Sequence, residues 1–226
     1  MSNPVKAPDT LMEAIQYFSD PLTCVQFFAG LRWENAEAVC PRCQYKRISF
    51  LTTRLMWKCL DCKKQFSIKV GTIFEDSAVT LDKWLCAMFL IANCKNGVSS
   101  YEIARDIHVT QRTAWFMLQR IRHAMHTGTF SKLSGQIEAD ETFIGGKARN
   151  MHAAKRAEKI TGTGVEPFHL YRYIDEQAFR FNNRATKDNP VNDSDRFSLL
   201  CSQIVGKRLT YAELTAKEDK KPEVPF

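Results

Sequence analysis

Four cysteines place the strongest constraint on how this chain folds. They form two Cys-x-x-Cys pairs with fifteen residues between the pairs: Cys40, Cys43, Cys59 and Cys62. A two-residue gap lets both thiolates of a pair turn towards one ion. Two such pairs, closed on each other by a short hairpin, supply the tetrahedral all-thiolate set of a structural zinc site. The alternative is two redox or disulfide pairs, but two matched pairs at this spacing favour zinc.

The cysteine content and the net charge indicate where in the cell this chain is located and which class of molecule it binds. The chain has eight cysteines in 226 residues, with no apolar run long enough to span a bilayer and no apolar signal-peptide core near Met1. We therefore expect reduced thiols, a cytoplasmic location and no membrane partner. The net charge of +7 favours a polyanionic partner, nucleic acid first.

Periodicity divides the chain into five stretches with an α+β composition. Asp20 followed by Pro21 predicts a helix start, and Trp33 is expected to pack under the zinc-binding module. Alternating residues around the cysteines predict short strands. The expected stretches are a helical segment at 1–36, a zinc ribbon at 37–70, a helical region at 71–130, a strand-bearing segment at 131–184 and a polar, partly disordered tail at 185–226.

The region from 99 to 125 has the pattern of a helix-turn-helix. Ser99 with Glu102 predicts a capping box for a short helix whose buried side includes Tyr101. His108 is expected to adopt a left-handed conformation in the turn, and Thr110 to cap a longer helix. In this motif the first residues of the second helix enter the major groove. The candidate DNA-contacting residues are Gln111 and Arg112, with Arg120 and Arg122 nearer the DNA backbone.

The zinc ribbon is rich in lysine and arginine. Phosphate contact is the functional interpretation of these side chains, and an ordinary solvated surface is the alternative; the sequence leaves both open. Lys63 and Lys64, directly after the second cysteine pair, are the ribbon's candidate DNA contacts.

Residues 135–146 predict a single strand bounded by glycines. Glu138 and Asp140 lie on one face of it, and Ile137, Ala139 and Phe143 on the other. Two carboxylates on one face are suitable metal ligands, but they are equally compatible with an edge strand that faces water.

Several motifs, taken in order, resemble those of bacterial insertion-sequence transposases with an N-terminal zinc ribbon and a DDE-type nuclease domain. The resemblance runs from about Leu11 to Lys147 and resumes at residues 165–184, 196–197 and 206–211. The motifs are Arg32-Trp33, Cys40-Pro-Arg-Cys43, Lys58-Cys-Leu-Asp-Cys62, Gly71-Thr-Ile-Phe74, Ala114-Trp-Phe-Met-Leu118, Arg120-Ile-Arg122 and Glu138-Ala-Asp-Glu-Thr-Phe-Ile-Gly-Gly-Lys147.

The resemblance implies an RNase H-like domain and metal-dependent DNA strand transfer, with Asp140 as the first catalytic aspartate. The family's second aspartate and third catalytic residue have no counterpart here, so we expect an internal deletion near residue 164 and an incomplete RNase H-like domain with a vestigial Asp140. Magnesium would be a cofactor only if that site were complete. Asp175 and Glu176 could be proposed as replacements. They are instead expected to be surface charges beside a helical stripe of Tyr171, Ile174, Ala178 and Phe181.

Three functions are compatible with these patterns. The favoured one is a catalytically incomplete, nucleoid-associated remnant that binds terminal inverted repeats in double-stranded DNA, with itself or an intact transposase as a further partner. The first alternative is an active DDE transposase that cleaves and transfers DNA strands. The second is a transcription regulator built from the zinc ribbon and the helix-turn-helix.

Overall fold

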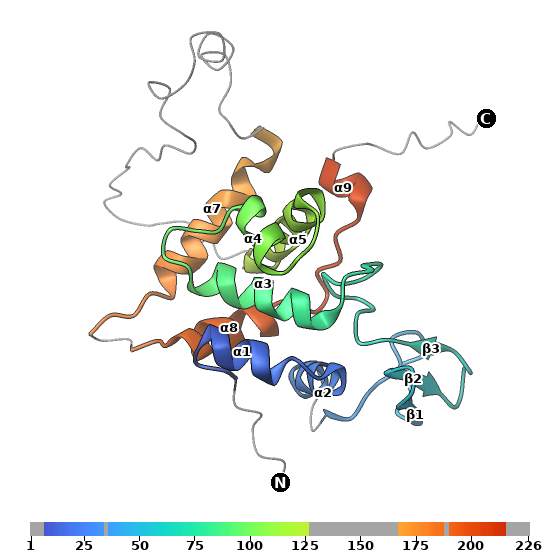
Figure 1. Cartoon of the computed structure of the whole chain (residues 1–226). Helices are drawn as coiled ribbons and strands as arrows, with labels where there is room; N and C mark the ends of the chain where they lie inside the picture. The colour runs from blue at the N-terminus through green and yellow to red at the C-terminus, as the bar shows by residue number, and fades with distance from the viewer. Residues whose placement is uncertain (1–6, 34–35, 127–166, 188–189, 216–226) are drawn as a thin grey trace, which may run out of the picture.

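The structure is a computed structural model, and it describes residues 7–33, 36–126, 167–187 and 190–215. They form a helical body with a small antiparallel sheet at one side (Figure 1), which agrees with the expected mixture of helices and a small sheet. The expected strand at 135–146, with Glu138 and Asp140, and the expected deletion junction lie outside these residues. Among the described helices, none combines the length and the apolar character needed to cross a membrane.

Two capped helices open the described chain. Helix α1 spans Leu11–Tyr17, and α2 spans Pro21–Arg32. Asp20 accepts a hydrogen bond from the backbone N–H of Thr23 at 2.8 Å, and Pro21 occupies the first turn, as the sequence predicts.

The core is built around α3, which spans Leu81–Asn93 and lies between α1, α2 and α8 on one side and α5 on the other (Figure 1). Trp84, Leu85 and Met88 on this helix are fully buried. Thr80 occupies the N-cap position, although its side chain makes no capping hydrogen bond.

The C-terminal stretch contributes residues 197–204 to this core. Helix α8 spans Asp193–Ser202 and α9 spans Tyr211–Thr215. Phe197 is fully buried, with ring centroids 6.0 Å from Phe27 and 5.4 Å from Phe89. Leu200 and Cys201 on the same helix are also fully buried, and α8 packs on α3, so this segment folds with the N-terminal helices.

Helices α4, Ser100–Asp106, and α5, Gln111–Met125, pack against each other across a tight turn. Ser99 and Thr110 accept capping hydrogen bonds from Glu102 N and Thr113 N, and His108 has φ of 54°, all as expected. Tyr101 is 74% exposed, so its expected burial is wrong.

Helix α7 spans Pro167–Asn182 and packs on α5 with its charged face inward. Asp175 and Glu176 are 6% and 3% exposed, whereas Tyr171 and Ile174 are 45% and 43% exposed. The expectation that the two acids are surface charges is therefore wrong: Glu176 turns towards Arg122 on α5, and Asp175 towards His126 at the end of that helix.

The sheet consists of β1 at Ile48–Leu51, β2 at Met56–Cys59 and β3 at Gln65–Phe66, in the order β1-β2-β3. Both pairings are antiparallel, with Phe50 opposite Trp57 and Trp57 opposite Phe66. The aromatic side chains of these three residues form the ribbon's small apolar face.

Candidate metal centre and adjoining cationic surface

The sheet brings the two cysteine pairs together. Cys40 and Cys43 lie in the turn before β1, and Cys59 and Cys62 lie at the end of β2 and in the turn that follows it. The residue after each pair has a left-handed backbone, with φ of 60° at Gln44 and 59° at Lys63. The two pairs thus share one local conformation, which turns all four sulfur atoms to the same point.

The four sulfur atoms have the spacing of a tetrahedral metal site. All lie within 4.8 Å of one another, with 3.7 Å between Sγ of Cys40 and Cys62 and 3.5 Å between Sγ of Cys43 and Cys59. A tetrahedron with Zn–S bonds of about 2.3 Å has sulfur–sulfur edges of about 3.8 Å. A disulfide requires about 2.05 Å, and all four thiols are free. The donor set and spacing therefore fit one metal ion, and four thiolates leave no position for a substrate.

The local backbone favours a thiolate at Cys40. Burial raises the pKa of this thiol, but hydrogen bonds from the backbone N–H groups of Cys43 and Arg42, together with those from the thiols of Cys43 and Cys62, outweigh it and bring the pKa to about 7. Because the thiolate is the metal-binding form of cysteine, Cys40 is prepared for coordination. At Cys43 a backbone hydrogen bond from Tyr45 lowers the pKa, but burial and the neighbouring thiols outweigh it and raise the pKa to about 12, so a metal ion would displace that proton.

Aromatic and polar contacts fasten the ribbon to the helical body. The Trp33 ring packs edge-on against Trp57, 5.0 Å between centroids, so its expected position under the ribbon is confirmed. Arg32 Nη1 donates to Ile68 O at 2.8 Å. The end of α2 and the end of the ribbon are thereby joined.

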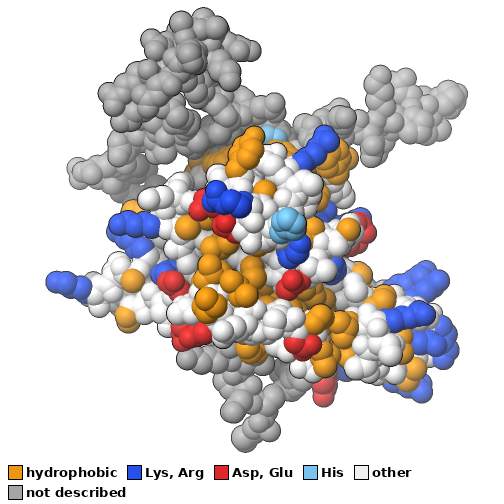
Figure 2. Space-filling view, in the orientation of Figure 1, with side chains coloured by type: hydrophobic (Ala, Val, Ile, Leu, Met, Phe, Trp, Pro, Cys, Tyr) orange, Lys and Arg blue, Asp and Glu red, His pale blue; other side chains and the backbone are white. Residues whose placement is uncertain are grey.

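Cationic side chains gather on the ribbon's surface, on the right of the view in Figure 2. Lys63 and Lys64 are exposed there, although Lys63 Nζ also donates to Leu60 O. Arg47 pairs with Asp61 at 3.5 Å at the surface. The other exposed members of this group are Arg42, Lys46 and Arg54.

The front of α5 borders an open groove of about 810 Å³. Arg112 is exposed and lines it, together with Lys83 from α3, whose Nζ donates to His108 O at 3.1 Å. Gln111 is half-buried and donates to Ser100 Oγ at 2.9 Å, so part of its hydrogen-bonding capacity is used within the α4–α5 pair.

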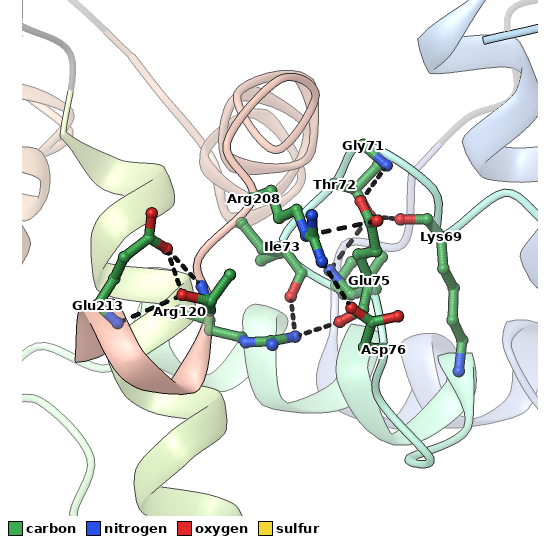
Figure 3. A network of polar contacts seen from close by, with 11 residues as sticks. Lys69, Gly71, Thr72, Ile73, Glu75, Asp76, Arg120, Arg208 and Glu213 are labelled. Carbon is green, nitrogen blue, oxygen red and sulfur yellow. Dashed lines mark hydrogen bonds and ion pairs between the residues drawn. The ribbon is translucent and has the colours of Figure 1, made fainter. Parts of the chain in front are cut away.

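Arg120 and Arg122 do not reach the surface, which corrects their assignment to the DNA backbone. Arg120 is 5% exposed and donates to the carbonyl oxygens of Ile73 and Glu75, both at 2.8 Å (Figure 3). Arg122 is 4% exposed and pairs with Glu176 at 2.5 Å. Both guanidinium groups are therefore used to hold α5 in place.

Residue Arg208, which the sequence did not single out, joins the same network. It pairs with Glu75 at 3.4 Å and Asp76 at 2.9 Å, next to the carbonyls that bind Arg120 (Figure 3). Gly206 N also donates to Gly71 O at 2.8 Å. These contacts tie the loop after α8 to the loop between the ribbon and α3, so a segment distant in sequence helps to hold the end of the ribbon.

The comparisons with known proteins identify the ribbon's class. Residues 22–65 match a family described as the transposase zinc-ribbon domain, of the IS1595 type. The matched stretch contains all four cysteines, so the chain carries a transposase-type zinc ribbon.

A relative extends the similarity beyond the ribbon. It is an uncharacterized protein in transposable element ISH50 of Halobacterium salinarum, 27% identical over 161 residues. These residues are 68% of this chain and 53% of the relative, so the chain spans about half of that protein's length. No solved structure matches the chain. The chain is thus a partial homologue of a transposable-element protein.

Proposed function

We propose that this chain is a DNA-binding protein of an insertion sequence that recognises terminal inverted repeats and lacks a complete catalytic site. The observation that carries the proposal is the transposase-type zinc ribbon, with its four sulfur atoms arranged for one metal ion. Zinc is the metal that suits four thiolates in this geometry. Because four thiolates leave no open coordination position, this metal would stabilise the ribbon rather than take part in catalysis.

The α4–α5 pair is proposed as a helix-turn-helix. Two short-linked helices, a turn that contains left-handed His108 and an exposed Arg112 at the front of the second helix support this role. Arg112 would contact a base edge or a phosphate in the major groove, and Lys63 and Lys64 would contact phosphates from the ribbon. Gln111 would contribute through the part of its amide group that its bond to Ser100 does not use.

The proposed loss of catalysis rests on the catalytic residues that are missing from the sequence and on the buried positions of Asp175 and Glu176. Asp140 is the only catalytic residue that the family resemblance supplies. Asp175 and Glu176, the candidate replacements, are buried in contacts with His126, Arg122 and Arg180. A protein of this kind would occupy repeat ends in the nucleoid of a bacterial cytoplasm, alone or with an intact transposase.

Fluorescence anisotropy with labelled duplexes tests the proposal. The zinc-loaded chain should bind the inverted repeats that flank its own coding region more tightly than scrambled duplexes, and its affinity should fall steeply with salt. Arg112→Ala should weaken the binding of repeat DNA by about 10-fold or more, in line with about 1–3 kcal/mol for a base contact. Lys187→Ala, which removes an exposed cation just after α7, is the matched control and should have little effect.

Equal affinity for repeat and scrambled DNA, together with no effect of Arg112→Ala, would refute the proposal. Specific binding to a promoter but not to the repeats would instead identify a transcription regulator.

A further inference from the structure

Helix α7 presents an apolar stripe to solvent. Tyr171, Ile174 and Phe181 are 45%, 43% and 62% exposed, and Ala178 between them is half-buried. These residues are spaced by three, four and three positions, so they lie along one side of the helix. The stripe covers about three turns at the edge of the helical body (Figure 1).

This stripe is not needed to hold α7 on the body, because the opposite face does so. Glu176 pairs with Arg122 at 2.5 Å and with Arg180 at 2.7 Å, and Asp175 lies 3.1 Å from His126. An amphipathic helix of a lone globular protein normally has the reverse arrangement, with its apolar side inward. The outward apolar side therefore points to a further binding partner.

The spacing of the stripe suits a second copy of the same helix. The four residues are arranged symmetrically about position 176, at distances of two and five residues on each side. When two identical helices pair antiparallel about a two-fold axis at this position, Tyr171 of one lies opposite Phe181 of the other, and Ile174 opposite Ala178. Two large rings meet, and a large side chain meets a small one, as interdigitating helices require.

The charge distribution also favours a second copy. The chain carries a net charge of +7, so two copies repel each other on average, but the charged residues of α7 that face α5 leave the outer side of this helix nearly neutral. Its exposed polar residues there are Gln177 and Asn182. Exposed Arg184, with its guanidinium carbon 4.0 Å from the Phe181 ring centroid, ends the stripe.

Arg184 distinguishes the two possible directions of pairing. In a parallel pair the two Arg184 side chains would be adjacent and would repel each other. In the antiparallel pair they lie at opposite ends of the contact, about 24 Å apart for sixteen residues at the helical rise, which exceeds the screening length at physiological salt.

We propose that α7 is a self-association surface through which two copies of this chain pair antiparallel, with the 171–181 stripe of each helix as the contact. The proposal concerns protein–protein contact and does not rest on DNA binding. The contact is small, so the dimer is expected to be weak and to exchange in solution.

Sedimentation velocity of the full zinc-loaded chain, without DNA, tests the proposal. The wild-type chain should shift from monomer to dimer as its concentration rises to about 100 μM. Ile174→Glu should remain monomeric, because it would bury a carboxylate opposite Ala178. Met12→Glu, a matched change at a 65% exposed residue on α1, should dimerise like the wild type. Unchanged circular dichroism and zinc content would show that both variants are folded.

A photo-crosslinking side chain at position 181 tests the register. In a mixture of isotopically light and heavy chains, the expected product joins position 181 of one chain to the peptide of the other that contains Tyr171. A wild-type chain that stays monomeric throughout, or crosslinks formed only within one chain to residues 127–166, would overturn the proposal. So would an Ile174→Glu variant that dimerises like the wild type. Monomeric Ile174→Glu should bind repeat DNA with unchanged affinity. A chain that dimerises but does not recognise repeat DNA would therefore contradict the proposed function and not the self-association.

Discussion

Arg122 on α5 and Glu176 on α7 form an ion pair, with 2.5 Å between Nε and Oε2, and their side chains are only 5% and 4% exposed. Arg180 approaches the other oxygen of the same carboxylate at 2.7 Å. One buried carboxylate thus pairs with two buried guanidinium groups, one through each oxygen. Removing it would leave both cations without their counter-charge in a poorly solvated interface.

Glu176→Ala should therefore destabilise the chain by about 3–5 kcal/mol, as is typical when one member of a buried pair is removed. Urea unfolding followed by circular dichroism measures the change. The matched control is Asp106→Ala, which breaks the solvent-exposed pair with Arg105 and should cost about 0–1 kcal/mol. Equal losses in the two variants would show that the Glu176 interface is open to water.

The titration of His123 should make stability depend on pH. Burial lowers the pKa of His123, and the nearby positive charges of Arg172, Lys207 and His126 lower it further. The unfolded side chain, with a pKa of about 6.5, then binds a proton at pH values where the folded one does not. This contribution to stability is complete above about pH 6.5 and is lost as the pH falls towards the folded pKa.

His123→Gln should accordingly lose less stability than the wild type between about pH 7 and pH 5. The measurement is the midpoint of urea unfolding at several pH values, and the difference between the two chains cancels the titration of carboxylates elsewhere. Met12→Gln, a change at an exposed residue without a titratable side chain, should keep the wild-type slope. If His123→Gln shows the same pH dependence of unfolding as the wild type, the pKa of His123 is not lowered by folding.

The burial of Phe197 predicts that α8 is essential to the fold. This side chain is fully buried among Phe18, Phe27 and Phe89. Phe197→Ala should cost about 3–5 kcal/mol, because the rings around it cannot close the cavity. Leu199→Ala, on the same helix at a residue that is 37% exposed, should change stability by about 0.5 kcal/mol or less. Thermal unfolding of both variants tests the difference, and a mild effect of Phe197→Ala would mean that α8 is only loosely attached.

The metal centre predicts a joint loss of metal and ribbon structure. The purified wild-type chain should contain about one zinc ion. Cys59→Ser should lose it and, with it, the packing of Trp57 on Trp33, because metal binding supplies much of the folding free energy of so small a module. Elemental analysis and tryptophan fluorescence report the two losses. Cys94→Ser, at a free cysteine outside the cluster, should retain both. A metal-free chain with native fluorescence would contradict a structural metal.

Local patterns predicted the ribbon and the α4–α5 pair well. The spacing of Cys40 and Cys43 determines a turn closed by backbone hydrogen bonds between Cys40 and the residues Gln44 and Tyr45, and Ser99 and Thr110 cap helices within a few residues of themselves. Such contacts depend on neighbours in the sequence, so a single sequence is enough to recognise them.

The inward face of α7 and the burial of two arginines could not be predicted in the same way. Periodicity shows that Tyr171 and Ile174 share a face, but not whether that face turns inward. The residues that pair with the charged side chains determine which face turns inward, and they are distant in sequence. Arg122 lies 54 positions from Glu176, and Arg120 binds Ile73 O across 47 positions. One available signal was that Arg120 and Arg122 flank Ile121 on the apolar side of α5, where long side chains often pack inward.

The last prediction concerns catalysis. Phosphoryl transfer by two metal ions needs several carboxylates to hold the ions about 3.5–4 Å apart. Of the acids considered, Glu176 is engaged by two arginines and Asp175 by His126, so neither is available to complete a site with Asp140. The zinc-loaded chain should therefore bind repeat DNA but leave it uncut when Mg²⁺ or Mn²⁺ is added. Asp140→Ala should bind the same DNA with unchanged affinity. Denaturing gels of end-labelled repeat DNA provide the test, and metal-dependent cleavage that Asp140→Ala abolishes would show that the chain is an active nuclease.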